Sequence, residues 1–138
     1  MKLKLTTDYA IRIIGYLYQN GDEISTAKHM SEQLYITYNY IIKVIASIKK
    51  AGYIESIQGA SGGYRLAKDA YDITLYDIIE AMEGKTLINH CLRGEGCNYY
   101  IKNNFNCPAH DALGTIQAEL INLLKNKKIN EVWAAKKL

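Results

Sequence analysis

The chain has 138 residues, of which 49% are hydrophobic, and it carries a formal net charge of +3. This length and apolar content suffice for one folded domain with its own core, or for one domain with an added dimerisation element. No apolar run approaches the ~20 residues that a membrane span requires, and the N-terminus lacks the apolar segment and cleavage site of a signal peptide. We therefore expect a folded cytoplasmic protein that does not enter a membrane.

The positive charge is concentrated in the first half of the chain. Residues 1–70 hold nine Lys and Arg against six Asp and Glu, whereas residues 71–138 hold eight of each sign. Such an uneven distribution is a weak electrostatic signature of nucleic-acid binding in the first half.

The first predicted element is a helix from Thr7 to Tyr18, which Gly21 ends. Its buried stripe consists of Ala10, Ile13, Ile14 and Leu17. Asp8 lies in the first turn, where a carboxylate interacts favourably with the positive end of the helix dipole. Helix stabilisation is therefore the plain interpretation of Asp8.

Two closely spaced helices follow. Ser25 is the predicted N-cap of the first, and Tyr35 and Ile36 alone separate that helix from Thr37, which can cap the second. The buried stripes are Ala27, Met30 and Leu34 in the first helix and Ile41, Val44, Ile45 and Ile48 in the second. The far face of the second helix mixes hydrogen-bonding, basic and small side chains. This pattern is typical of a helix-turn-helix whose second helix enters a major groove.

A β-hairpin is predicted directly after Gly52, which stops the second helix. Residues 53–58 and 64–67 flank a turn from Gly59 to Gly63 that favours positive φ angles and close backbone approach. Such a wing can touch phosphates or a minor groove. The predicted DNA contacts are Thr37, Tyr38, Asn39, Tyr40, Ile42, Lys43 and Lys50 on the helix, and Gln58, Gly59, Ser61, Gly62, Gly63 and Arg65 on the wing.

All three cysteines of the chain follow a further capped helix that begins at Thr74 and ends at Gly84. Cys91, Cys97 and Cys107 lie within seventeen residues, on a Gly- and Asn-rich stretch without helical periodicity. Three is an odd number, so a closed set of disulfides explains them poorly. His110 follows Cys107 at the i, i+3 spacing that places both side chains on one side of a first helical turn.

This group of side chains resembles the ligand set of a soft metal centre. Structural zinc sites bring cysteines in close C-x₂₋₄-C pairs, whereas the intervals here are five and nine residues. An iron-sulfur cluster is wider and suits such a loop better. The remaining alternatives are buried cysteines that act as small apolar residues, or free thiols.

The last long helix is predicted from Asp111 to about Lys127, and it has two neighbouring apolar stripes. We expect one stripe to pack on its own domain and the other on the same helix of a second copy, which gives a twofold dimer. A monomeric core that buries both stripes is the alternative. The predicted dimerisation residues are Leu113, Ile116, Leu120, Ile121, Leu123 and Leu124, and the tail with Val132 and Trp133 is expected to dock back on the body.

Several runs resemble a known family over nearly the whole chain. They are KLTTDYAIRIIGYL, the run IIKVIASIKKAGYIESIQGASGGYRLAKDAYDITLYDIIEAMEG and the three-cysteine loop. They are similar to the winged-helix iron-sulfur regulators of the IscR, NsrR and RirA type. The resemblance implies a homodimeric transcriptional regulator, usually a repressor, whose affinity for a near-palindromic operator in double-stranded DNA depends on the cluster. Ile42 and Gln58 depart from the residues that IscR has there, so a different operator sequence is expected.

The resemblance also implies cluster ligands. Three cysteines on this loop hold the cluster in the family, and they correspond to Cys91, Cys97 and Cys107. The run from Cys107 to His110 resembles the IscR arrangement, in which a histidine completes a [2Fe-2S] site. Asp8 resembles the NsrR aspartate that reaches across the dimer to a [4Fe-4S] cluster. We rank His110 and [2Fe-2S] first.

The predicted fold is mainly α with a small β-hairpin. It comprises a winged helix-turn-helix domain (residues 1–84), a cluster-binding loop (85–110) and a long dimerisation helix with its tail (111–138). The predicted function is a regulator, not an enzyme, that senses redox state, nitric oxide or iron and cluster status. Two rivals are a cluster-free regulator that uses thiol oxidation or a protein partner, and a small redox metalloprotein.

Overall fold

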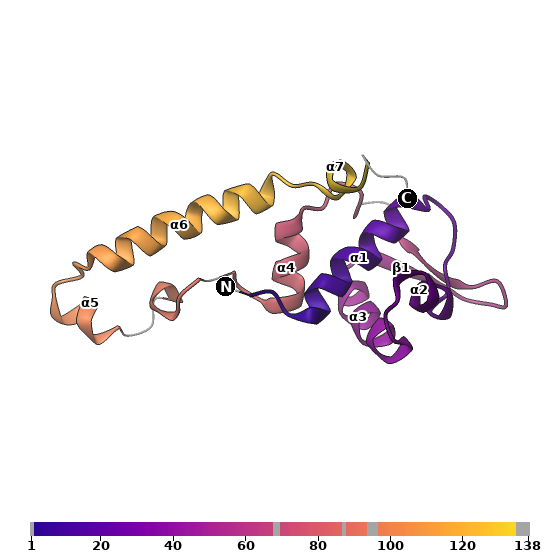
Figure 1. Ribbon diagram of the computed structural model, residues 1–138, viewed down its shortest axis with the longest axis horizontal. Coiled ribbons are helices and arrows are strands. Elements are labelled where there is room, and N and C mark those ends of the chain that lie inside the picture. The colour runs from indigo at the N-terminus through magenta and orange to yellow at the C-terminus, as the bar shows by residue number, and fades with distance from the viewer. Residues whose placement is uncertain (1, 68–69, 87, 94–96, 135–138) are drawn as a thin grey trace.

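The computed structural model describes residues 2–67, 70–86, 88–93 and 97–134. The elements, in chain order, are α1 (Leu5–Gln19), α2 (Ala27–Leu34), α3 (Tyr38–Lys50), β1 (Ile54–Ile57), β2 (Gly63–Leu66), α4 (Leu75–Glu83), the 3₁₀ helix η2 (His90–Arg93), α5 (Asn98–Lys102), α6 (Pro108–Lys125) and α7 (Ile129–Ala134). This order confirms a mainly α fold with a small β-hairpin (Figure 1). Within the described ranges, no helix is long and apolar enough to cross a membrane.

The body of the molecule is built around α1, α2, α3 and α4. The apolar stripes predicted for the first three helices meet in one cluster, in which Ile14, Met30 and Ile48 are fully buried. The apolar face of α4 closes the cluster through Ile78. Burial of these stripes, rather than the propensity of such short helices, fixes the angle at which α3 is presented.

The ends of the helices differ in part from the sequence prediction. Thr74 and Asp77 form a reciprocal capping box at the start of α4, as predicted. Thr26, not Ser25, caps α2, because the backbone of Ser25 is already paired with Tyr64 in an isolated β-bridge. At the other predicted cap, Thr37 occupies the N-cap position of α3 but makes no side-chain capping bond.

Two predicted helices also begin earlier than expected. The first starts at Leu5 rather than Thr7, and the last starts at Pro108 rather than Asp111. Proline suits the first turn of a helix because its missing N–H would have no partner there. The loop predicted for residues 85–110 contains η2 and α5, while its residues 87 and 94–96 lie outside the described ranges.

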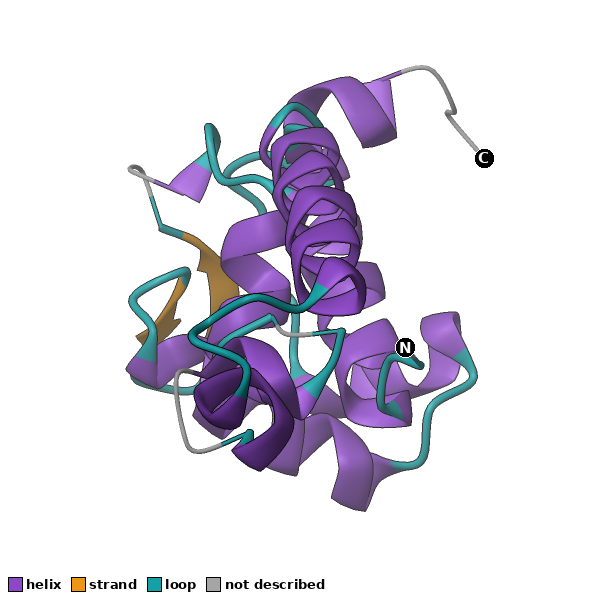
Figure 2. Cartoon of the chain, turned by 90° about the vertical axis from the view of Figure 1, so that its left-hand side faces the viewer, coloured by secondary structure: helices purple, strands orange, loops and turns teal. Residues whose placement is uncertain are grey.

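The wing is an antiparallel hairpin of β1 and β2, in which Ile54 pairs with Leu66 and Ile57 with Gly63. Figure 2 shows this small sheet beside the helices. A Cβ at Gly62 would lie 2.2 Å from the backbone oxygen of Ile57. The turn therefore needs glycine at this position for its own closure, whatever it contacts outside the protein.

The C-terminal part leaves the body and returns to it. Figure 1 shows α6 extending away from the body with α5 at its far end, while α7 lies back against α1. Ile129 is fully buried, and the indole of Trp133 covers Gly15 so closely that a Cβ there would lie 2.0 Å from Trp133 Cε2. Docking of the tail through Trp133 is thus confirmed, and residues 135–138 lie outside the described ranges.

Candidate DNA interface and cysteine loop

The predicted recognition face lies on the outside of α3. Tyr38 is 53% exposed and Ile42 is 40% exposed, whereas the stripe on the opposite side of the helix is buried. The ring of Tyr40 packs edge-on against Tyr9 of α1, with the centroids 5.6 Å apart, yet it remains 40% exposed. The other predicted helix contacts, Thr37, Asn39, Lys43 and Lys50, are also exposed. All seven residues predicted on the helix are therefore accessible to solvent.

Some of the predicted wing contacts are exposed, whereas others are partly covered or already paired within the wing. Gln58, Gly59 and Ser61 are exposed at the turn, and Gly62 and Gly63 are partly covered. Arg65 forms a cross-strand ion pair with Glu55, and this hydrogen bond raises the pKa of the guanidinium. Arg65 thus ties the two strands of the wing together in the free protein.

Each cysteine lies in a helix or at the N-terminus of one. Cys91 belongs to η2, while Cys97 and Cys107 occupy the N-cap positions of α5 and α6. The Sγ of Cys107 accepts a hydrogen bond from the backbone N–H of His110, at 3.4 Å. All three thiols are free and partly exposed.

His110 is held by an aromatic contact that sequence reasoning missed. Its imidazole stacks on Tyr100 with centroids 4.3 Å apart and planes inclined by 22°, and Tyr100 in turn meets Phe105 edge-on. The Nδ1 atom of His110 is inaccessible to water and has no hydrogen-bond partner. Only the 10-residue separation of Tyr100 and His110 was visible in the sequence, and it is not a helical spacing.

The donor chemistry of the loop fits a soft metal centre, but its present arrangement does not assemble one. Three thiols and an imidazole nitrogen without a partner are suitable ligands. Among the residues that the structure describes, however, no three His, Cys, Asp or Glu side chains gather closely enough to hold an ion. The alternative ligand Asp8 forms an ion pair with Arg12 one turn along α1. Ligation would therefore require the loop to rearrange.

A family model described as Rrf2, iron-dependent transcriptional regulator, matches residues 3–135. The chain belongs to the Rrf2 family. It is accordingly a transcriptional regulator and not an enzyme.

Individual relatives agree with this assignment. This Rrf2 chain is 34% identical to the HTH-type transcriptional regulator NsrR of Bacillus licheniformis over 96 residues, which cover 69% of this chain and 67% of that protein. Its fold is similar to that of CymR (YrzC), the global cysteine regulator of B. subtilis (TM-score 0.75, 21% identity, 99% of both chains covered). IscR of T. potens is also similar, with a TM-score of 0.75 and 22% identity over 99% of this chain and 89% of that chain.

The long helix of this Rrf2 regulator is unusual in having no buried residue at all. Ile116 is 53% exposed and Leu123 is 61% exposed, although both are large and apolar. The remaining predicted dimerisation residues, Leu113, Leu120, Ile121 and Leu124, are only partly covered. A helix whose apolar stripes are at most partly covered has less of the packing that normally stabilises a helix.

Proposed function

We propose that this Rrf2 regulator is a homodimeric repressor that reads a near-palindromic operator with α3 and the wing. We further propose that it holds an iron-sulfur cluster, [2Fe-2S] in preference to [4Fe-4S], on Cys91, Cys97, Cys107 and His110. The observation that carries the proposal is the position of the loop. All three cysteines lie in the chain between the DNA-binding body and the partly exposed helix α6, with Cys107 as the N-cap of that helix and His110 in its first turn.

This position suggests how the loop controls DNA binding. A bound cluster supplies a centre that reacts with oxidants and nitric oxide. Thiolates drawn together from η2, α5 and α6 fix the loop and therefore the start of α6. If α6 joins two copies, its start sets the separation and angle of the two recognition helices, which must match half-sites about one DNA turn apart.

The family description, iron-dependent transcriptional regulator, supports the metal part of this proposal. The buried and unpaired Nδ1 of His110 supports the choice of fourth ligand. The ion pair between Asp8 and Arg12 supports the plainer interpretation of Asp8 as a helix-stabilising residue. Asp8 remains the alternative ligand.

Iron and acid-labile sulfide per monomer, measured with a visible spectrum on protein purified without oxygen, test the proposal. About two of each per monomer are expected, and about four of each would favour the larger cluster and Asp8. His110→Ala should change the spectrum or the lifetime of the cluster, whereas the matched change His90→Ala, at an exposed position of η2, should not. An unaltered spectrum in His110→Ala would transfer the role to Asp8.

A cluster-free regulator that responds to thiol oxidation is the second candidate. The observation in its favour is that all three thiols are unpaired and partly exposed, so oxidants can reach them. Colourless protein without iron, even after attempted reconstitution, would support this candidate. Oxidation should then change DNA affinity in the wild type and leave a variant without the three cysteines unaffected.

A further inference from the structure

Two large apolar side chains remain uncovered on the outer face of α3. Tyr38 is 53% exposed and Ile42, one helical turn later, is 40% exposed. Residues four apart lie on the same side of a helix, so Tyr38, Ile42 and Ala46 form one row along α3. Ala46 is exposed as well, and its side chain is a single methyl group. We call these three residues the apolar row.

The core beneath α3 fixes the direction in which the apolar row points. The buried residues of the helix form the stripe that faces this core, and they are Ile41, Val44, Ile45 and Ile48. Because rotation of α3 about its axis would expose that stripe, Ile42 cannot turn inward to find cover. The apolar row is therefore a fixed feature of the surface.

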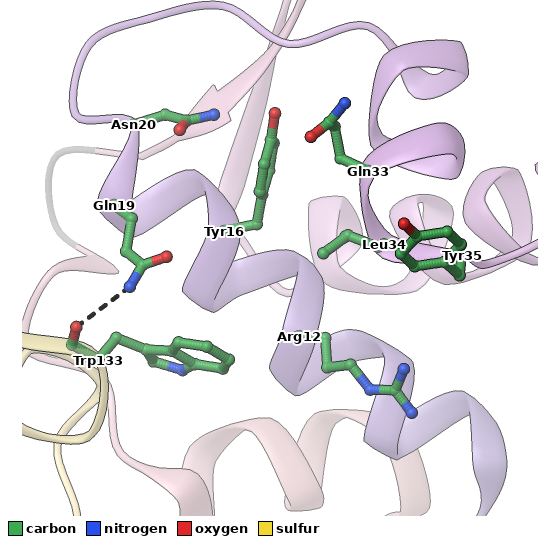
Figure 3. A pocket seen from close by; sticks show the side chains of 8 residues that line it. All are labelled: Arg12, Tyr16, Gln19, Asn20, Gln33, Leu34, Tyr35 and Trp133. Atoms are coloured by element: carbon green, nitrogen blue, oxygen red, sulfur yellow. Dashed lines mark hydrogen bonds between the residues drawn. The ribbon is translucent and has the colours of Figure 1, made fainter. Parts of the chain in front are cut away.

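The apolar row is separate from the cavity that other aromatic side chains form. That cavity, of about 630 Å³, lies between α1, the end of α2 and α7 (Figure 3). The residues that line it either precede α3 in the chain, as Tyr16 and Tyr35 do, or belong to α7, as Trp133 does. The cavity therefore offers no cover for Ile42.

The residues beside the apolar row indicate that it faces DNA. Asn39 and Lys43, also four residues apart, form a second exposed row, and Lys50 is exposed at the end of the helix. Since α3 contains no Asp or Glu, no carboxylate on it repels a phosphate. An asparagine can bind adenine through N6 and N7, while a lysine can bind phosphates. The outer face thus combines groups for the DNA backbone, for hydrogen bonds to bases and for apolar contact.

An apolar side chain in a major groove has one matching partner among the base edges. The C5-methyl of thymine is the apolar group there, whereas the other groups that distinguish the bases are hydrogen-bond donors or acceptors. Ile42 cannot hydrogen-bond, so it would leave the amino group of a facing cytosine without a partner. Against a thymine methyl, both contacting groups are apolar and both leave water. Ile42 therefore favours thymine over cytosine at the base pair that it faces.

We infer that Ile42 reads the C5-methyl of one thymine in each half of the operator, with Tyr38 and Ala46 flanking that contact in the apolar row. This inference rests on the proposed reading of an operator by α3, and it adds the base that the helix selects. The neighbouring Asn39 suits an adenine, so the centre of each half-site is expected to consist of A·T pairs.

Replacement of thymine by uracil tests the inference, because it removes the methyl group and leaves every hydrogen-bonding group of the base pair in place. A binding sequence is first enriched from random duplexes with the full-length protein, in its iron-loaded and in its cluster-free form. Each thymine of the enriched duplex is then replaced in turn, and affinity is measured by fluorescence anisotropy. At one position in each half-site, we expect the replacement to weaken binding about fourfold, the value of one methyl group returned to water.

Variants of Ile42 decide which side chain reads the methyl group. In Ile42→Ala, the uracil replacement at that position should have no effect. Ile42→Val keeps a branched apolar side chain and should retain most of the fourfold loss. The matched control is Val132→Ala, which shortens an apolar side chain of similar exposure (38%) on α7 and should show the full loss. Alanine is the best helix former, so the fold should survive in Ile42→Ala, and circular dichroism verifies this.

The possible outcomes separate this inference from the proposed function. An equal loss on uracil replacement in Ile42→Ala and in the wild type would overturn the inference. An enriched sequence in which no thymine methyl affects affinity would overturn it too, while leaving the operator reading intact. A wild type that enriches no sequence in either form would instead refute the proposed function, and the inference with it.

Discussion

The body and the arm of this regulator, the arm being α5 and α6 (Asn98–Lys125), use apolar residues in opposite ways. In the body, Ile13, Ile41 and Ile48 have no exposed surface, and helices from both halves of the HTH share one core. In the arm, neither helix contains a buried residue, and Ile116, Leu123 and Phe105 are half exposed or more. The body therefore has a closed core in one copy, whereas the arm leaves apolar surface available for the proposed second copy.

This difference separates what the two regions do. A body with a closed core holds α3 and the wing rigidly with respect to each other. An arm whose stripes are only partly covered can gain stability from association, so in the proposed dimer we expect its conformation to depend on concentration and on the state of the cysteine loop. A regulator built in this way can change the spacing of two rigid DNA-binding bodies without unfolding either of them.

The largest expected effect comes from making the same substitution in both regions. Ile48→Ala should lower the free energy of unfolding by about 2–5 kcal/mol, because it leaves a cavity in the core of the body. Ile116→Ala should change the unfolding of dilute monomer by less than about 0.5 kcal/mol, since the side chain is 53% exposed. Urea unfolding at several protein concentrations measures both.

The concentration series supplies the contrast. The unfolding midpoint of the wild type should rise with protein concentration, and this rise should be smaller in Ile116→Ala and preserved in Ile48→Ala. If the two variants lost the same free energy of unfolding in dilute protein, the arm would belong to the same core as the body.

A second pair of substitutions places alanine at a helical glycine in each region. Gly15→Ala should destabilise the body by about 1–3 kcal/mol and shift Trp133 emission to the red, because its Cβ would overlap the indole. Gly114→Ala in α6 meets only Leu92 Cδ2 at 3.7 Å, an ordinary contact, and should stabilise the helix by about 0.5–1 kcal/mol. Thermal unfolding with fluorescence detection tests the expected loss of stability in Gly15→Ala and the expected gain in Gly114→Ala. If both changes destabilised the protein, the space around Gly114 would be as tightly packed as that around Gly15.

The sequence predicted the body well because its elements are fixed by local patterns. Ile41, Val44, Ile45 and Ile48 have helical spacing and are all buried, and the capping box at Thr74 forms as the pattern requires. Ser25 was wrong as a cap for a nonlocal reason. Its backbone pairs with Tyr64, which is 39 residues away in the sequence, so the neighbouring Thr26 takes the role.

The candidate sites were less predictable, because they depend on contacts without a sequence period. One stripe of α6 was expected to face a second copy and the other to pack on its own domain, and the exposure of Ile116 and Leu123 agrees with the first part of that proposal. The stacking of Tyr100 on His110 and the fit of Trp133 on Gly15 were not foreseen. Nothing in the sequence around Gly15 indicates that the indole of Trp133, 118 residues later, packs against it.

The smallest expected effect distinguishes residues that hold the body together from those that face DNA. Thr74→Ala should cost about 1 kcal/mol of unfolding free energy, since it removes one side of the capping box, and should leave DNA affinity unchanged. Thr37→Ala should lower the unfolding free energy by only a few tenths of a kcal/mol, because the Thr37 side chain makes no capping bond. It should instead weaken binding to duplex DNA a few-fold at every salt concentration, as a neutral phosphate contact releases no counterion. Chemical unfolding and fluorescence anisotropy with a fixed duplex separate the two roles, and unchanged anisotropy in Thr37→Ala would place the start of α3 away from the phosphates.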